Sequence, residues 1–551
     1  MTRPRSLRWL GLLTGALLAW LVLLPLLFVA LEAVRSRHGM TLEALGRFVS
    51  VPMEWHVLAN SLLLSILSVI GSALLGVPLA LLVTRVDFPG RRLAATLLSL
   101  PAVLPPLVGV MAFLFLYGES GFVSHLVQTA LRLEDAPWRL EGLVAVLLVH
   151  VTTMYVYFYL FTRAGLAGID GSVYEAAASL GAGPWRTFRR VTLPLLRSHL
   201  AGAGLLVLMT ALASFSAPYL FGGRFRVMPT QIMATKLNGD DRLAMVETLS
   251  LTLLSLGGLW LMRRADRGPG GRGGSKGTPP PAKPIGGVPG RILIPAAAWM
   301  AAVWLVLPHA ALLVVSLVPR GTWTIEAVPP VLNLGNYLTL VRDPVRLGPI
   351  LTSTWMAVVA TVGALILAGV VAWLAVRARV ASGPWLEVMI ALPGAVPGPV
   401  FAIALATAFS VNAPWVGRLL LVGTPVILPL AYLVRNLPVS GRALLAGFRQ
   451  LDPSLDEVAA SLGATGWRRL IRVTVPLLRP ALLAAATLGF VTAFGDFVTS
   501  ILLYTYDTRP ISLEILTSLR QSDVGVAAAY GALLMIVSAI VFYAAGEERM
   551  T

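Results

Sequence analysis

The sequence has no cysteine among its 551 residues and few charged side chains. The missing cysteines exclude disulfide bonds and thiolate metal ligands. Charged residues make up only 13% of the chain and hydrophobic residues 57%, whereas soluble domains have about 25% and about 45–50%. This deficit of charge predicts an integral membrane protein.

Two further absences narrow the function. No G-x-x-x-x-G-K-[ST] phosphate-binding loop occurs, so the chain is not expected to hydrolyse ATP itself. Its six histidines are scattered and no cluster of acid, base and nucleophile is visible, which predicts no catalytic residues, no metal site and no cofactor in this chain. A membrane-embedded enzyme is therefore the least favoured class.

What the sequence does contain is long apolar runs. A helix needs about 20 apolar residues to cross a membrane. The apolar core of the first run is too long for a secretory signal, whose core has about 7 to 15 residues, so this run is expected to stay as a span. The chain is thus predicted to be all-α with about 12 transmembrane helices, at residues 10–31, 57–83, 94–117, 142–162, 200–221, 243–262, 292–318, 351–376, 388–410, 419–435, 481–503 and 525–545.

The basic residues indicate the orientation. Lys and Arg outnumber Asp and Glu by 43 to 26. Most of them lie in segments that are cytoplasmic if the N-terminus is cytoplasmic. None lies in the interior of a predicted span, since Arg435 is the last residue of 419–435. This bias is typical of multi-pass membrane proteins and is no sign of nucleic acid. We expect a lipid-embedded protein with both termini in the cytoplasm and no nucleic-acid partner.

The chain also repeats itself. Between 170–197 and 452–479, 282 positions apart, 18 of 28 residues are identical. Upstream, Arg85 aligns with Arg377. The segment 263–291 is rich in Gly and Pro and is predicted to be a cytoplasmic linker. The expected domains are a first repeat at 1–262 and a second at 292–551, each with six spans. Because six is even, the repeats should be parallel and related by an axis along the membrane normal.

The duplicated segment has the signals of two short helices with a bend between them. Ser172 and Ser454, each followed three residues later by a glutamate, predict a capping box at the start of the first helix. Gly181 and Gly463 stand where a left-handed residue would end it. A second helical piece is expected before Pro194 and Pro476. One such basic loop could serve topology alone, but two similar copies favour a docking surface for a partner with two equivalent sites.

These residues resemble the EAA loop of binding-protein-dependent ABC importer permeases. The first copy has the motif at Glu175, Ala176, Ala177, Gly181 and Pro194; the second keeps its spacing at Glu457, Ala459, Gly463 and Pro476 and departs from it at Val458 and Val475. The resemblance covers nearly the whole chain, and the fused layout is similar to ferric iron and thiamine importer permeases.

This resemblance implies a permease subunit in the inner membrane of a bacterium, which forms the path for a solute delivered by a periplasmic or extracellular binding protein. It implies that both loops dock into a separate cytoplasmic ABC ATPase dimer, which uses the ATP. The ferric iron type is expected first and the thiamine type next. The segments 228–241 and 509–523 are candidate contacts for the binding protein.

One competing class remains. The segment "TRVDFPGRR" at 84–92, with Asp87, Gly90, Arg91 and Arg92, is similar to the loop signature of major-facilitator secondary transporters, which also have twelve spans. Ion-coupled carriers of that kind need titratable groups within their spans, and few are visible here. An ATPase that co-purifies with the chain would separate the two classes.

Asp496 is the acidic residue that lies deepest in a predicted span, and Ser214 is its partner in the first repeat. The carboxylate could be hydrogen-bonded between helices, or it could be a polar point on the translocation path. We take Ser214 and Asp496 as candidate path residues. His150 and His309 are interpreted as packed polar side chains.

Overall fold

The computed structural model describes residues 5–36, 39–102, 104–265, 280, 282–284, 288–319, 322, 331–410, 417–452 and 454–547. Within these residues the fold is helical, as predicted, and the extended structure amounts to four two-residue strands. Strands β1 (Arg35–Ser36) and β2 (Gly39–Met40) pair antiparallel, and β3 (Val86–Asp87) pairs in parallel with β4 (Lys283–Pro284).

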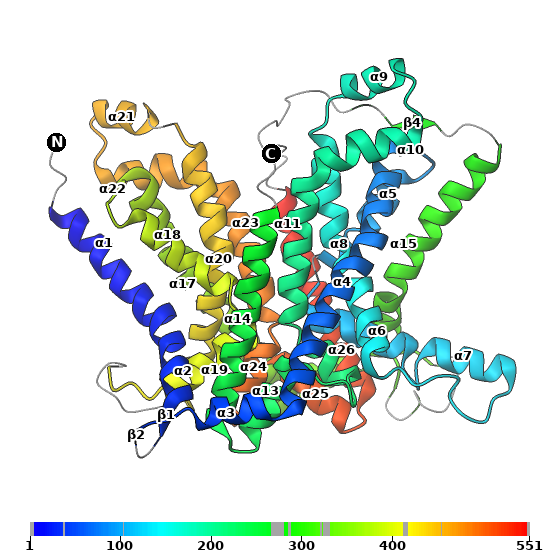
Figure 1. Ribbon diagram of the computed structural model, residues 1–551, viewed down its shortest axis with the longest axis horizontal. Coiled ribbons are helices and arrows are strands. Elements are labelled where there is room, and N and C mark those ends of the chain that lie inside the picture. Colours follow the sequence, from blue (N-terminus) through cyan, green and yellow to red (C-terminus); the bar gives the residue numbers. More distant parts are fainter. Residues whose placement is uncertain are drawn as a thin grey trace.

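The helices of the first repeat follow one another in the order seen in Figure 1. They are α1 (Arg5–Leu18), η1 (Ala19–Leu23), α2 (Leu24–Val34), α3 (Glu43–Ser50), α4 (Pro52–Arg85), α5 (Arg91–Leu97), η2 (Leu100–Ala102), α6 (Pro106–Tyr117), α7 (Phe122–Leu131), α8 (Gly142–Ala167), α9 (Gly171–Ser179), α10 (Pro184–Thr187), η3 (Phe188–Thr192), α11 (Leu193–Leu212), α12 (Ser216–Phe221), α13 (Met228–Leu237) and α14 (Asp241–Ala265).

The second repeat has the same order without a counterpart of α7 in the part that the structure describes. Its helices are α15 (Val288–Ser316), α16 (Gly335–Arg342), α17 (Pro344–Ala372), η5 (Trp373–Arg377), α18 (Gly383–Ala391), η6 (Leu392–Gly394), α19 (Gly398–Ala408), α20 (Ile427–Gln450), α21 (Ser454–Ser461), α22 (Gly466–Arg469), η8 (Leu470–Thr474), α23 (Val475–Phe494), α24 (Val498–Leu503), η9 (Tyr506–Thr508), α25 (Ile511–Arg520) and α26 (Val524–Glu547).

The predicted number of spans agrees with these helices. Ten helices among the described residues are long and apolar enough to cross a membrane, and one bent pair, α18 and α19, brings the count to 11. Helix α20 completes twelve: it has 24 residues and packs along α17 and α23, but Arg435, Arg442 and Arg449 lower its hydropathy. It begins eight residues later than the predicted 419–435 and extends well beyond it.

Prolines explain where other predicted spans differ. The runs at 94–117 and 388–410 are each split, the second with a bend of 107°. Pro105 and Pro397 stand at the two splits. Each helix is interrupted there because proline has no N–H to donate to the helix. The runs at 200–221 and 481–503 instead start earlier, at 184 and 466, and end before the short helices α12 and α24.

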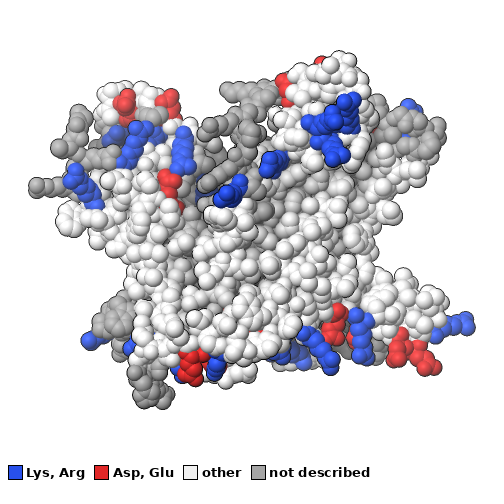
Figure 2. All heavy atoms as spheres, in the orientation of Figure 1, with Lys and Arg blue, Asp and Glu red and all other residues white. Residues whose placement is uncertain are grey.

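The molecule has two ends, and its surface between them differs from both. Helices α9 and α21 lie at one end, where α1 begins and α26 ends, and α3, α13 and α25 lie at the other (Figure 1). On the face drawn in Figure 2, charged side chains gather at both ends and leave a broad band without charge between them. The parallel orientation of the repeats therefore agrees with the prediction, and the band has the character of a lipid-facing surface.

The repeats exchange their first spans. Helices α1 and α2 pack on α18 and α19 of the second repeat, and α15 packs on α5 and α6 of the first. One hydrophobic core includes buried residues of both repeats. Most of the predicted linker, at 266–279, 281 and 285–287, lies outside the described residues. Near its end, Pro280 lies beside Gly171 at the start of α9, and β4 pairs with β3 of the first repeat.

Candidate functional site

The two duplicated segments form short helices that stand away from the bundle. Helices α9 and α21 are at the same end of the molecule and at equivalent places in the two repeats (Figure 1). Each helix buries one small residue, Ala177 in α9 and Ala459 in α21. The glutamates Glu175 and Glu457 are exposed. Ala176 is exposed as well.

The start of each helix differs from the predicted capping box. The carboxylate of Asp170 accepts from the backbone N–H of Ser172 at 3.0 Å, and Asp452 accepts from the N–H of Ser454 at 2.9 Å. The predicted Ser–Glu pair is therefore wrong as the cap: an aspartate two residues before the serine satisfies the free N–H group instead. The N–H of Ser454 holds the pKa of Asp452 below its usual range.

The glycine prediction is confirmed at both helix ends. Gly181 has φ +70° and Gly463 has φ +78°. The N–H of Ala182 reaches back to the carbonyl of Ala177 at 3.0 Å, and the same bond joins Ala464 to Ala459 at 3.0 Å. This six-to-one closure is a Schellman motif, which needs the left-handed residue to turn the chain.

After the bend the chain does not stop at the proline. Helix α10 continues through the π-helical turn η3 into α11, giving one span at 184–212, and the second repeat does the same over 466–494. Pro194 and Pro476 each lie at the second position of the following α-helix. The wider π turn accommodates the missing proline N–H, so that the basic segment is joined rigidly to a transmembrane span.

Each segment exposes large apolar side chains at equivalent positions. Leu180 and Leu462 are 84% and 82% exposed, and Trp185 and Trp467 are 71% and 69% exposed. Exposing apolar side chains of this size to water is unfavourable, and a partner that covered them would remove this cost. We call these four residues the loop tips.

An arginine holds each segment against the bundle. In the first repeat the Arg85 guanidinium donates to the Tyr174 hydroxyl and lies 4.0 Å from its ring centroid. In the second, Arg377 Nε lies 3.6 Å from Asp456 Oδ2, and its Nη2 donates to the Leu451 carbonyl at 3.3 Å. Position 174 corresponds to 456, so both anchors use the same geometry with different chemistry. The repeat alignment paired the arginines but gave no sign of this role.

We expect Arg377→Gln to loosen α21 because the ion pair and the carbonyl contact are both lost, at a cost of about 1–2 kcal/mol. Hydrogen exchange should become faster at 454–463 and uptake should fall severalfold. Arg379→Gln, an exposed arginine two residues away, is the control and should leave both unchanged. Unchanged exchange in Arg377→Gln would show that the anchor is not needed.

The corrected cap gives a second prediction. Asp452→Ala removes the acceptor of the Ser454 N–H, so α21 should fray at its start, whereas Glu457→Ala removes no hydrogen bond that the structure shows. Circular dichroism and exchange at 454–457 should therefore change only in Asp452→Ala. If Glu457→Ala alone still lowers uptake, the cause is a contact with a partner. Because the carboxylate must be charged to cap, and its pKa is depressed, the contribution of Asp452 is present at neutral pH and is lost in acid.

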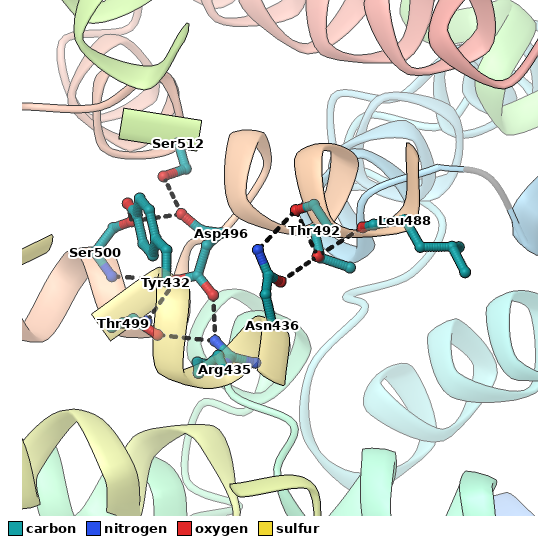
Figure 3. Close-up of polar contacts among 10 residues, drawn as sticks. Tyr432, Arg435, Asn436, Leu488, Thr492, Asp496, Thr499, Ser500 and Ser512 are labelled. Carbon is teal, nitrogen blue, oxygen red and sulfur yellow. Dashed lines mark hydrogen bonds and ion pairs between the residues drawn. The ribbon is translucent and has the colours of Figure 1, made fainter. Parts of the chain in front are cut away.

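The second candidate region surrounds Asp496, between α23 and α24 (Figure 3). The carboxylate pairs with the Arg435 guanidinium of α20 and accepts from the Thr499 N–H at 2.8 Å. Arg435 also donates to the Thr499 hydroxyl at 2.8 Å. The Asp496 carbonyl accepts from Ser512 at 2.6 Å, which ties α25 to the same point. The prediction that no Arg lies within a span is therefore wrong at Arg435, whose charge is paired.

The first repeat builds the equivalent place without charge. His150, which corresponds to Tyr432, lies between the hydroxyls of Ser68 and Ser214, 2.8 Å from each. It is buried and hydrogen-bonded, in keeping with its interpretation as a packed polar residue. Ser214 and Asp496 are thus not brought together; each bonds to the neighbouring span of its own repeat.

The residues that follow them do meet. Phe215 and Phe497 occupy equivalent positions, and their ring centroids are 5.8 Å apart. A residue contacts its own equivalent only next to a twofold axis, so the pseudo-axis passes between these rings. Both are buried, and Tyr219 stacks on Phe215 and receives a hydrogen bond from Arg520 of the other repeat. Aromatic side chains therefore fill the space at the pseudo-axis beside Ser214 and Asp496.

The structure buries more carboxylate side chains than the sequence led us to expect. Glu54 and Glu247 are both buried near the ends of α4 and α14, and Glu247 accepts from Thr235 at 2.8 Å. Gln231 lies beside them, 3.5 Å from Glu54. The expectation of few titratable groups missed this pair because hydropathy does not show which helices meet. No group of three or more His, Cys, Asp or Glu able to hold a metal occurs among the described residues.

These features define a multi-pass membrane protein made of two parallel helical repeats. The family of binding-protein-dependent transport system inner membrane components matches residues 72–269 and 364–546, which is more than half of the chain. The chain belongs to this family and is an ABC importer permease in which two permease repeats are fused. This membership overturns the major-facilitator alternative.

Relatives of similar layout align over most of the chain. A probable ABC transporter permease protein y4fN of Sinorhizobium fredii is 29% identical over 99% of this chain and 97% of its own. The ferric transport system permease protein FbpB of Actinobacillus pleuropneumoniae is 29% identical over 95% and 76%. The thiamine transport system permease protein ThiP of Escherichia coli is 27% identical over 83% and 82%. Among solved structures, a bacterial ABC transporter involved in alginate import aligns at 17% identity over 46% of this chain and 94% of that chain, with a TM-score of 0.37, too low to support an argument.

Proposed function

We propose that this chain is the transmembrane subunit of an importer whose two loops, 170–197 and 452–479, dock on a dimer of separate cytoplasmic ATPase subunits. The observation that carries the proposal is the pair of loop tips, exposed at equivalent positions and each joined to a span without a break. The proposed contact residues are Glu175, Ala176, Ala177, Gly181 and Pro194 with Glu457, Ala459, Gly463 and Pro476. A surface duplicated about an axis fits a partner that is itself a dimer.

The proposed topology places this end in the cytoplasm of a bacterium and the protein in the inner membrane, with both termini cytoplasmic. The basic residues of α10, η3, α22 and η8 support this orientation. Helices α13 and α25, at the opposite end, would face the solute-binding protein. We place the first repeat at 1–262, the linker at 263–291 and the second repeat at 292–551.

We propose that the solute moves along the pseudo-axis between the repeats, past Ser214 and Asp496. The support is their position next to Phe215 and Phe497, which meet at the axis. The closed aromatic contact would have to separate for a solute to pass, and Asp496 with Arg435 would then be the polar groups closest to it.

Ferric iron is the proposed cargo, with thiamine next. The names of the aligned relatives support this order, since ferric permeases align over 82–95% of the chain at 29–30% identity. The deciding experiment uses vesicles that contain the permease and its ATPase, with a candidate binding protein added outside. We expect the Fe³⁺-loaded protein to stimulate ATP hydrolysis. Stimulation by a thiamine-loaded protein alone would assign the second cargo, and stimulation by neither would reject both.

Cutting the linker tests the proposed domain boundaries. Co-expressed 1–275 and 276–551 should restore at least half of the uptake, because each part keeps six spans and one loop, and the exchanged first spans give the halves an extensive contact. The cut leaves β4 with the second fragment, where it can still pair with β3. As a control, 1–275 alone should give no uptake. Inactive but assembled halves would show that the covalent linker itself is required.

A further inference from the structure

A cavity of about 610 Å³ lies between α4, α5 and α8. The ends of α4 and α8 that adjoin it are at the same end of the molecule as α9 (Figure 1). The cavity includes residues of the segment 84–92, which the permease function leaves unexplained. Its lining combines basic, hydroxyl and apolar side chains: Val83, Thr84, Arg91, Arg92, Ala95, Thr96, Ser99, Leu160, Arg163, Ala164 and Ala167.

The cavity carries more positive charge than its neighbours neutralise. Arg91 lies 3.9 Å from Asp87, a distant pair with an exposed carboxylate. Arg163 donates to the Tyr159 hydroxyl at 3.3 Å, which is uncharged. The Arg92 side chain is exposed, and its guanidinium shows no hydrogen bond or ion pair within the described residues. Three guanidinium groups therefore share one distant carboxylate.

A buried hydroxyl group without a hydrogen-bond partner also lies beside the cavity. Thr84 is among the lining residues, but its Oγ1 is itself buried and has no hydrogen-bond partner among the described residues. A buried polar atom without a partner costs free energy, of the order of 1–3 kcal/mol in general. An anion with several acceptor oxygens would pair with the guanidinium groups, and Thr84 could join it only by turning its hydroxyl into the cavity.

The fold itself does not require these arginines. In the second repeat, Gly383 and Pro384 replace Arg91 and Arg92, and Leu445 replaces Arg163. The register is sound there, because Gly165 and its equivalent Gly447 both face a leucine of the following span, Leu196 and Leu478. Arg442 stands at the position of the lining residue Leu160, so the second repeat keeps one arginine there. The cluster of three arginines belongs to the first repeat only.

The position of the cavity selects the source of the anion. It lies at the loop ends of two transmembrane helices, the level at which lipid phosphates meet a protein. Leu93 of α5, and Leu160 and Phe161 of α8, are apolar and exposed, which suits contact with acyl chains. We propose that this cavity binds the phosphate headgroup of an anionic phospholipid of the cytoplasmic leaflet. Arginine suits this role because its planar fork matches phosphate oxygens.

Native mass spectrometry of the purified full chain tests the site. The probes are phosphatidylglycerol, zwitterionic phosphatidylethanolamine and inorganic phosphate. The wild type should retain one phosphatidylglycerol through detergent washing, and Arg92→Gln with Arg163→Gln should lower its affinity on the order of tenfold or more. Arg264→Gln is the control. It removes an exposed positive charge from the C-terminal end of α14, outside the cavity, and the variant should bind lipid as the wild type does.

Three outcomes would overturn the proposal: equal retention of phosphatidylethanolamine, unchanged retention in the double variant, or displacement of the lipid by millimolar inorganic phosphate, which would assign the site to a free anion. Thermal unfolding of the double variant without lipid distinguishes loss of the site from loss of the fold. We expect its midpoint to equal that of the wild type without lipid, and added phosphatidylglycerol should raise only the wild-type midpoint.

Discussion

Replacing Gly181 and Gly463 together by valine should nearly abolish uptake while the twelve spans still insert. Both glycines are left-handed, and a β-branched residue there costs on the order of 1–2 kcal/mol or more at each site. A Cβ at either position would meet no atom within 4 Å, so the defect comes from the backbone alone. The bend between α9 and α10, and between α21 and α22, would be lost, and with it the placement of the loop tips.

The measurement is uptake together with recovery of the ATPase and its hydrolysis rate. The single changes should show the same defect, unequally in the two repeats. Gly183→Val and Gly466→Val are matched controls, because both positions have open space but no positive φ, and the pair should transport nearly normally. Full uptake and full ATPase recovery in Gly181→Val with Gly463→Val would reduce the segments to ordinary basic loops.

Asp496→Asn should lower uptake by about tenfold or more without affecting assembly with the ATPase. The change keeps the shape and leaves the Arg435 charge facing a neutral group. Breaking a fully buried pair costs about 3–5 kcal/mol. The Arg435 side chain is 34% exposed, so solvent should reduce the cost to about 1–3 kcal/mol. Expression and ATPase recovery should stay normal because the residue is remote from α9 and α21.

A second variant separates a structural role from a role in the path. Adding Arg435→Gln to Asp496→Asn removes the unpaired charge, so thermal stability should recover. If Asp496 is on the path, uptake should remain low all the same. Ser214→Ala tests the equivalent position in the first repeat, where only a neutral hydrogen bond to His150 is lost, at about 1 kcal/mol. Uptake at the wild-type level in Asp496→Asn would reject a role for its charge.

Local signals in the sequence predicted the loop segments well. The glycine bend depends on a few adjacent residues, and two near-identical copies reinforced each other, so the left-handed conformation of Gly181 and Gly463 was predictable. The cap was not, because Asp170 and Ser172 are both good N-terminal residues and sequence alone does not decide which one faces the free N–H group.

Contacts between distant segments were not predictable. Arg435 looked like the end of a span because hydropathy counts one helix at a time, whereas its charge is balanced by Asp496, 61 residues later. Arg377 and Asp456 likewise meet only through the fold. The split spans escaped notice because an apolar run with prolines reads as continuous, and the bend of 107° depends on how its two parts pack.

Cross-linking from the loop tips tests the docking proposal most directly, and the absence of cysteine makes each introduced thiol unique. Leu180→Cys and Leu462→Cys, both at highly exposed positions, should each cross-link to the ATPase subunit through a short bifunctional reagent in membranes. Tyr506→Cys, 82% exposed but at the opposite end, should not. Cross-links to the ATPase from both tips and none from residue 506 are the predicted result. No cross-link from either tip, or an equal one from residue 506, would contradict it.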